Sequence, residues 1–164
     1  MKRVVKTFEQ YSVYTNDKFW GTIGAGILPL CKENGKFLVP FRSEFVNEPN
    51  TYGVWGGKLD DMETDDPKKA AIQEFQEECG YTDKIKMIPS YVYEKNDQNG
   101  KNIFTYFNYI GIIENEFKPI LNWETESYKW VSLEELYNIE PKHFGLEDLL
   151  ENARKQIEEI YSSI

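Results

Sequence analysis

Three glutamates stand at positions 74, 77 and 78, within the run PKKAAIQEFQEECG at 67–80. Residues three and four apart share one face of a helix, so Glu74, Glu77 and Glu78 would lie together and repel one another. A divalent cation between them would remove that repulsion, and hard carboxylate oxygens suit Mg²⁺ or Mn²⁺. The cluster therefore predicts either a metal site or a solvated helix face.

The flanking residues predict where this helix begins and ends. Asp66 is a good N-cap, and Pro67 suits the first helical position. Gly80 is a natural stop, because glycine adopts the left-handed C-terminal conformation without strain. The other side of the helix is apolar: Ala71, Ile72, Phe75 and Cys79. We therefore expect that side to pack on a core and the glutamates to take the opposite side.

The remaining segments predict a mixed sheet. Strands are expected at 22–30, 36–42, 52–55, 85–93, 102–113 and 126–131. Asn34-Gly35 and Asn99-Gly100 are strong hairpin turn signals. A capping pattern at Ser132 opens a short helix, and an apolar stripe from Leu146 to Ile160 predicts one amphipathic C-terminal helix. Strands, a helix, more strands and more helices indicate a sheet with helices packed on its faces.

Composition narrows the classes of partner. The chain has 164 residues with a formal net charge of −9, which fits one acidic domain and gives no bulk attraction to long nucleic acids or anionic membranes. Its two cysteines, Cys31 and Cys79, do not make a disulfide framework, so a reduced cytoplasmic setting is expected. No apolar run is long enough for a signal peptide or a membrane span. The oligomeric state is open, with a homodimer as one option.

Residues 56–81, GGKLDDMETDDPKKAAIQEFQEECGY, resemble the Nudix box, G-x5-E-x7-R-E-U-x-E-E-x-G-U, in which U is apolar. Gly57 matches the first glycine, Glu63 the next glutamate, and residues 73–81 the remainder. The strand GTIGAGILPL and a late E…W-V-S-L-E-E-L element extend the likeness over residues 20–136. The runs LNWETESYKW and HFGLEDLL also look like Nudix proteins of phages and bacteria. The resemblance implies a single Nudix domain over 1–164, of the α+β class, with an α/β/α sandwich.

Two departures from the box affect its loop. The nine residues 64–72 separate Glu63 from Gln73, where the family pattern has seven. Counting seven residues back from Gln73 places Asp65 in the glutamate position instead. Gln73 replaces the arginine that pairs with the loop glutamate in the family. It can hydrogen-bond either carboxylate, but without the strength that a guanidinium charge adds.

The resemblance also implies roles for named residues. Glu74, Glu77 and Glu78 would hold Mg²⁺ or Mn²⁺, together with the main-chain carbonyl of Gly57. The metal would bind diphosphate oxygens and activate a water molecule. A further carboxylate often comes from a later loop, and Glu124 is the first candidate and Glu126 the second. The general base would be a box glutamate or this later residue.

Substrate-binding residues are suggested by position. Arg42 ends a strand beside the expected cleft, and Lys58 follows the glycines; each could contact phosphate or serve only as a surface or ion-pair residue. Trp20 and Trp55 could stack on a base, although core packing is the more common role of such side chains. His143 is the only histidine, and we expect it in a loop or a helix cap rather than in catalysis.

The predicted function is a metal-dependent pyrophosphohydrolase of nucleoside diphosphate-linked substrates, with nucleoside triphosphates preferred. Hydrolysis of ADP-ribose or nucleotide sugars is an alternative. A Nudix module that binds nucleotides without turnover is another, motivated by Gln73 and the longer loop. An isomerase of the isopentenyl diphosphate type is disfavoured, since it needs a substrate-facing cysteine and both cysteines look buried.

Overall fold

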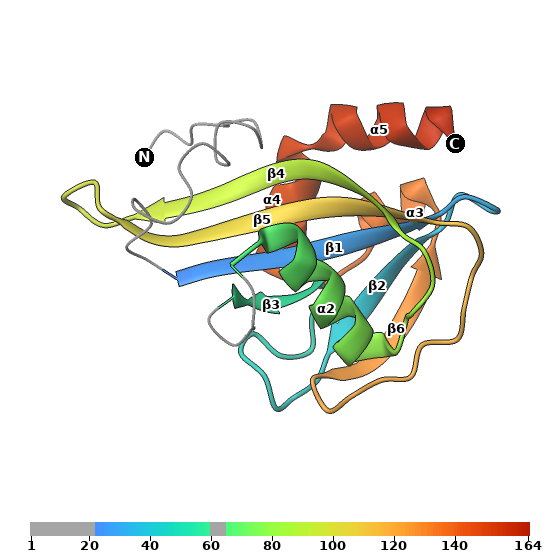
Figure 1. Ribbon diagram of the computed structural model, residues 1–164, viewed down its shortest axis with the longest axis horizontal. Coiled ribbons are helices and arrows are strands. Elements are labelled where there is room, and N and C mark those ends of the chain that lie inside the picture. Colours follow the sequence, from blue (N-terminus) through green and yellow to red (C-terminus); the bar gives the residue numbers. More distant parts are fainter. Residues whose placement is uncertain (1–21, 60–64) are drawn as a thin grey trace.

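The computed structural model describes residues 22–59 and 65–164 (Figure 1). Its strands are β1 (Thr22–Cys31), β2 (Phe37–Arg42), β3 (Trp55–Lys58), β4 (Lys86–Asn96), β5 (Asn102–Ile113) and β6 (Thr125–Val131). Its helices are α2 (Pro67–Cys79), α3 (Leu133–Asn138), α4 (Phe144–Asn152) and α5 (Arg154–Ser163). No helix of the described residues is long and apolar enough to cross a membrane.

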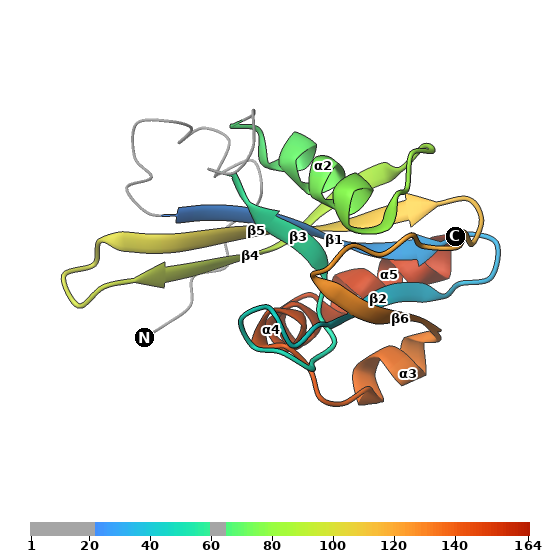
Figure 2. The same cartoon turned by 90° about the horizontal axis from the view of Figure 1, so that it is seen from below.

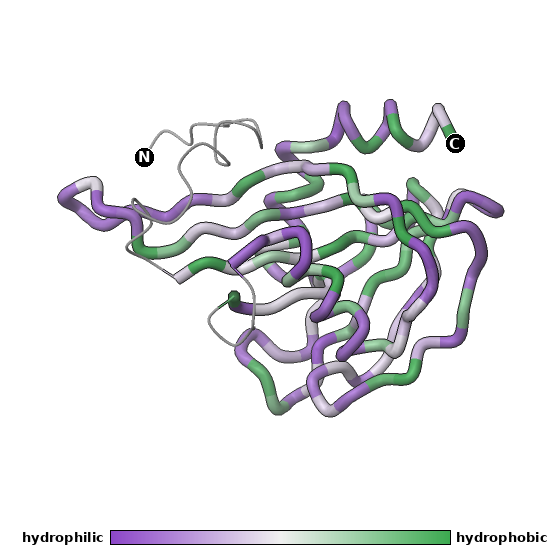
Figure 3. The backbone as a smooth tube through the Cα atoms, viewed as in Figure 1, coloured by the Kyte–Doolittle hydropathy of each residue, from purple (hydrophilic) through white to green (hydrophobic). Residues whose placement is uncertain are grey.

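The six strands form one mixed sheet, as predicted. Its order is β4-β5-β1-β2-β6, and β3 pairs with β1 off this path. β1 runs parallel to β5 and antiparallel to both β2 and β3. In Figure 3 the central strands carry most of the hydrophobic colour, while the tip of the β4–β5 hairpin is hydrophilic. The apolar middle of the sheet is therefore the part that the helices cover.

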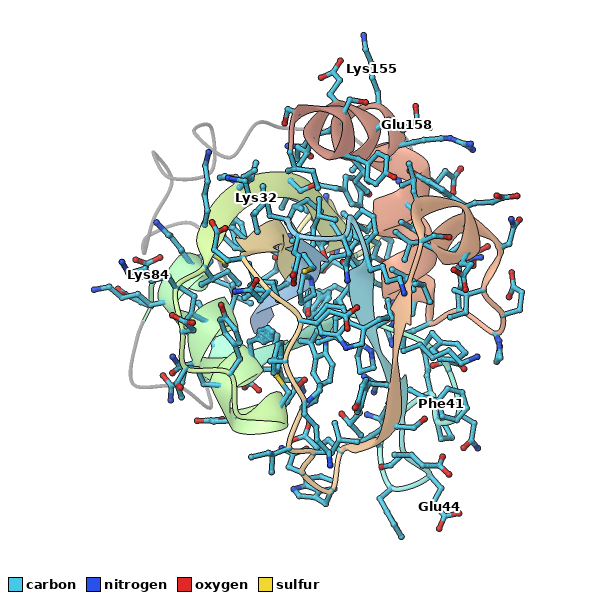
Figure 4. All side chains as sticks on the ribbon, turned by 90° about the vertical axis from the view of Figure 1, so that its right-hand side faces the viewer. Lys32, Phe41, Glu44, Lys84, Lys155 and Glu158 are labelled. Carbon is cyan, nitrogen blue, oxygen red and sulfur yellow. The ribbon has the colours of Figure 1, made fainter. Side chains whose placement is uncertain are left out.

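Helices pack on both faces of the sheet, which confirms the α/β/α sandwich. Figure 2 shows α2 above the sheet and α4 and α5 below it. The α2 side has its own core, in which Trp55 and Phe75 stack with ring centroids 5.8 Å apart. The α4 side has a second core around Leu28, Tyr91 and Leu149. Figure 4 shows side chains filling these layers, whereas those of Lys155 and Glu158 on α5 point outward.

The predicted turns and caps are present. Gly35 and Gly100 take positive φ angles of 69° and 79°, the conformations that turns of this kind require. Asp66 caps α2 by accepting from the Lys68 N–H, and Gly80 ends the helix with φ 75°. Ser132 and Glu135 form the expected capping box of α3. These features depend on neighbouring residues in the chain, which explains why the sequence predicted them.

Two element predictions are wrong. The strand expected at 52–55 begins only at Trp55, because Tyr52 makes isolated bridges to Phe41 and Lys142 while the paired segment runs through the glycines. The single C-terminal helix is two helices, α4 and α5, which meet at Ala153 with φ −110° and ψ 14°. This break lets Leu149 and Ile157, on separate helices, pack in the same core.

Candidate active site

Helix α2 places the three box glutamates unequally. Glu74 and Glu78 are buried, with 8% and 5% of their surface exposed, whereas Glu77 is exposed. Glu74 and Glu78 share the buried side of the helix with Phe75. The expectation of a glutamate side opposite the apolar side is therefore wrong for two of the three residues. Their burial points the two carboxylates at β3 rather than at solvent.

The glycine pair of β3 makes room for this approach. Gly56 and Gly57 pair with Gly26 and Ala25 of β1. A Cβ at Gly57 would lie 2.6 Å from the Cδ of Glu74, so any larger residue would displace the carboxylate. The backbone of Gly56 hydrogen-bonds the Glu78 carboxylate. The two glycines thus receive the two buried glutamates, one each.

The charges of the buried carboxylates act on one another. Burial raises the pKa of Glu78 well above its ordinary range, and the charges of Glu74 and Glu124 raise it further. The Gly56 hydrogen bond and the Arg42 charge oppose this rise in pKa without cancelling it. A divalent cation here would offset the repulsion, so the donor set suits Mg²⁺ or Mn²⁺. Residues 22–59 and 65–164 contain no preassembled group of three His, Cys, Asp or Glu side chains that could hold a metal.

A pocket of about 590 Å³ opens beside these carboxylates. Gly57, Lys58, Glu74 and Glu124 line it on the side of β3 and the loop before β6. Six aromatic side chains line other parts of it: Phe45, Tyr93, Phe104, Tyr106, Trp123 and Phe144. The volume falls in the range of small-molecule sites. The pocket therefore combines acidic, basic and aromatic surfaces in one space.

The expected phosphate-binding residues both reach the pocket. Arg42 lines it, and its guanidinium donates to the backbone carbonyls of Asn47 and Glu48. These bonds position the side chain while its charge still acts on Glu78. Lys58 also lines the pocket, from the exposed end of β3. Both cations are therefore placed where an anionic group beside the carboxylates would meet them.

The two later glutamates differ in position. Glu124 is half-buried and lines the pocket, just before β6 begins. Its backbone is held on both sides, since its N–H donates to Asn122 Oδ1 and its carbonyl accepts from Ser43. Glu126 is exposed on β6 and does not line the pocket. The geometry favours Glu124 over Glu126 as the additional carboxylate.

Four predicted residues lie elsewhere or outside the described chain. Trp55 is a core residue and not a base-stacking residue: it is fully buried, and its indole N–H donates to the Leu38 carbonyl at 3.1 Å. Gln73 Nε2 donates to Glu77 Oε1 at 3.1 Å. Trp20 and Glu63, with their expected roles in base stacking and loop orientation, lie outside the described residues.

His143 has the expected capping role. It is the N-cap of α4, and its Nδ1 accepts from the Gly145 N–H at 3.0 Å. Its Nε2 lies 2.8 Å from Glu48 Oε2. Burial and the nearby Arg42 charge lower the pKa of His143, against the opposing effect of Glu48. The residue thus ties α4 to the loop that holds Arg42.

Several pocket residues were missed from the sequence. Phe45 and Trp123 are strongly exposed, at 74% and 65%, and come from loops far apart in the chain. Phe144 and Tyr93 meet edge to face across α4 and β4, 5.9 Å apart. The position of Trp123 directly before Glu124 was the one local signal available. The others depend on strand pairing and helix packing, which no short motif encodes.

The fold and the family match together define a class: an α/β/α hydrolase of phosphoric anhydride bonds. The chain belongs to the Nudix family, since the NUDIX domain model matches residues 21–153. The predicted family and hydrolase class are confirmed at this level. No curated protein matches the sequence.

Solved structures share the fold at low sequence identity. A Nudix hydrolase from M. smegmatis, RenU, superposes with a TM-score of 0.71 at 20% identity, covering 100% of this chain and 97% of that one. The NUDIX domain of Shewanella oneidensis NrtR, in complex with ADP ribose, gives 0.66 at 16%, with coverages of 93% and 99%. A C. elegans Ap4A hydrolase gives 0.63 at 21%, with coverages of 84% and 98%.

Proposed function

We propose that this protein is a metal-dependent pyrophosphohydrolase of nucleoside diphosphate-linked substrates, with a preference for nucleoside triphosphates. The observation that carries the proposal is the shared pocket, which joins the Glu74 and Glu124 carboxylates to exposed aromatic side chains. A phosphoric anhydride needs the first surface and a nucleobase suits the second.

The proposed roles are those of the box residues. Glu74, Glu77 and Glu78 would hold Mg²⁺ or Mn²⁺ with the Gly57 carbonyl. Such an ion would supply a positive charge that lowers the pKa of a water molecule and offsets the phosphate charge. Glu124 is the first candidate for the base that takes the proton of the attacking water. That water forms a bond to phosphorus, and the anhydride P–O bond breaks with its electrons leaving on the departing phosphate.

The rest of the pocket orients the substrate in this proposal. Arg42 and Lys58 bind phosphate oxygens, where their charges counter those of the substrate. Phe45 and Trp123 cover the base, because large exposed aromatic side chains beside a pocket bind flat rings well. A reduced cytoplasmic setting fits the two free, buried cysteines. The single domain over 1–164 and the homodimer stay predictions.

An alternative substrate class is ADP-ribose or nucleotide sugars. The NrtR domain binds ADP ribose, and the C. elegans enzyme is an Ap4A hydrolase. A binding module without turnover is the second candidate function, favoured by the contact of Gln73 with the proposed ligand Glu77. The isomerase alternative lacks its cysteine among the described residues, because Cys31 and Cys79 are both buried.

One experiment separates these functions. The protein is incubated with Mg²⁺ or Mn²⁺ and nucleoside triphosphates, nucleotide sugars, ADP-ribose and dinucleoside polyphosphates, and the products are identified. We expect release of a nucleoside monophosphate, with triphosphates turned over fastest. Glu77→Gln and Glu78→Gln should each lose most of the turnover while keeping the fold, and Glu126→Gln is the matched control. Near-full activity of both box variants would contradict the proposal, and tight nucleotide binding without any product would favour the binding module.

A further inference from the structure

The side chain of Tyr106 packs over three glycines, Gly24 and Gly26 on β1 and Gly56 on β3. It lies on β5, beside Gly24 of the parallel strand β1. A Cβ at Gly24 would lie 2.7 Å from Tyr106 Cδ2, and a Cβ at Gly26 would lie 3.0 Å from Tyr106 Cζ. A side chain at either glycine would therefore collide with the Tyr106 ring. The ring of Tyr106 therefore extends across β1, over two positions that have no side chain.

The hydroxyl of Tyr106 lies beside Gly56, the first residue of the glycine pair. A Cβ at Gly56 would collide directly with the Tyr106 hydroxyl oxygen. Gly56 is the residue whose backbone hydrogen-bonds Glu78. The phenol thus ends beside the segment that receives the buried carboxylates, and Tyr106 also lines the pocket.

The Tyr106 hydroxyl keeps its proton at neutral pH, because an ordinary phenol has a pKa of about 10. A protonated phenol is a neutral hydrogen-bond donor. Glu74 lies at Gly57 and Glu78 at Gly56, and an ionised carboxylate accepts hydrogen bonds but cannot donate them. The Tyr106 hydroxyl can donate at this point.

We propose that the Tyr106 hydroxyl donates a hydrogen bond to a non-bridging oxygen of the substrate's diphosphate. The inference rests on the proposed function, because it assigns a residue to the same site. The glycines at 24, 26 and 56 leave room for the ring, and the ring carries the hydroxyl to Gly56. If the residue only packed, the ring alone would be enough, and phenylalanine would fill the same space equally well.

Tyr106→Phe tests this difference, since it removes only the hydroxyl. Two quantities are measured with Mg²⁺: kcat/KM for the best nucleotide of the substrate panel, and the inhibition constant of inorganic pyrophosphate. We expect Tyr106→Phe to weaken pyrophosphate about 10-fold and to lower kcat/KM by at least as much, the usual effect of losing a hydrogen bond to a charged group. The melting temperature should stay close to that of the wild type.

Tyr109→Phe is the matched control, because Tyr109 lies on the same strand but in the α2-side core. It should leave both quantities within about twofold of wild type, well below the effect of a lost charged hydrogen bond. If Tyr106→Phe behaves like this control in a fully active protein, the inference is overturned while the proposed function stands. If the wild type neither hydrolyses nor binds any member of the panel, the proposed function itself fails.

A second measurement needs no loss of the hydroxyl. Site-specific 3-fluorotyrosine at position 106 retains the donor and reports its surroundings by 19F NMR. Addition of Mg²⁺ and pyrophosphate should shift the signal at position 106 and leave a label at position 109 unmoved. An unchanged signal at position 106 under saturating pyrophosphate would contradict the contact.

Discussion

The carboxylate of Glu74 lies in the space that a side chain at Gly57 would need, with the Glu74 Cδ 2.6 Å from an ideal Cβ on that glycine. The position of the Glu74 carboxylate therefore requires a glycine at position 57. The close approach depends on a missing Cβ and not on a positive φ angle, since Gly57 is not among the positive-φ residues.

Gly57→Ala should displace the Glu74 carboxylate. We expect a loss of about 1–3 kcal/mol in unfolding free energy from overpacking and a fall in turnover of more than about 10-fold, since misplaced ligands weaken catalysis. Denaturant unfolding and steady-state kinetics measure the two effects. Gly53→Ala is the control, because its new Cβ would meet only ordinary contacts at 3.6 Å from Arg42 and His143. Equal behaviour of the two variants would contradict the packing argument.

The raised pKa of Glu78 predicts a pH-dependent stability in metal-free protein. Because the folded-state pKa lies above the unfolded one, the folded state binds more protons between the two values. This contribution to stability is fully present below the ordinary carboxyl pKa and is lost as the pH rises through the raised one. Thermal unfolding in a chelator, from pH 4 to pH 8, should show this loss.

Glu78→Gln should flatten that pH dependence, whereas Glu126→Gln should keep it, because Glu126 is exposed. Mg²⁺ should stabilise the wild type more at the upper end of the range, because a cation favours the ionised carboxylates. A Mg²⁺ effect that is equal at all pH values would argue against binding at Glu78.

Trp55→Phe should affect stability rather than substrate recognition. The change removes a buried hydrogen bond to Leu38 and part of the stack on Phe75. We expect a loss of about 2 kcal/mol in unfolding free energy. The Michaelis constants for a panel of nucleotides should keep their rank order. A changed rank order would show that Trp55 contributes to substrate binding.

Trp123→Ala should affect substrate recognition rather than stability. Its side chain is 65% exposed beside the pocket, so truncation removes little core packing. We expect a several-fold rise in the Michaelis constant for a nucleotide, about 1 kcal/mol of lost stacking, with unfolding free energy almost unchanged. Inorganic pyrophosphate has no base, so its inhibition constant should not move. A parallel loss of pyrophosphate binding would show that Trp123 does not act through a base.

The sequence predicted the features that depend on near neighbours. Asp66 and Gly80 bound α2, the Asn-Gly pairs form turns, and the box spacing indicated the family. It could not show that Trp55 is a core residue and Trp123 a pocket residue, because each lies close to a candidate site residue and only packing places Trp55 in the core. It also could not show that the C-terminal stripe breaks at Ala153, since both halves continue the same apolar pattern.

The sequence by itself determined that glutamates at 74, 77 and 78 would share a helix beside a glycine pair. Helical spacing and capping are local properties of the chain. Only the tertiary structure decided that Glu74 and Glu78 are buried against β3 while Glu77 faces solvent. It also decided that Tyr106, from β5, reaches Gly56 of that glycine pair. The physical reason is strand pairing: β1 lies between β3 and β5, so residues about fifty positions apart meet across it.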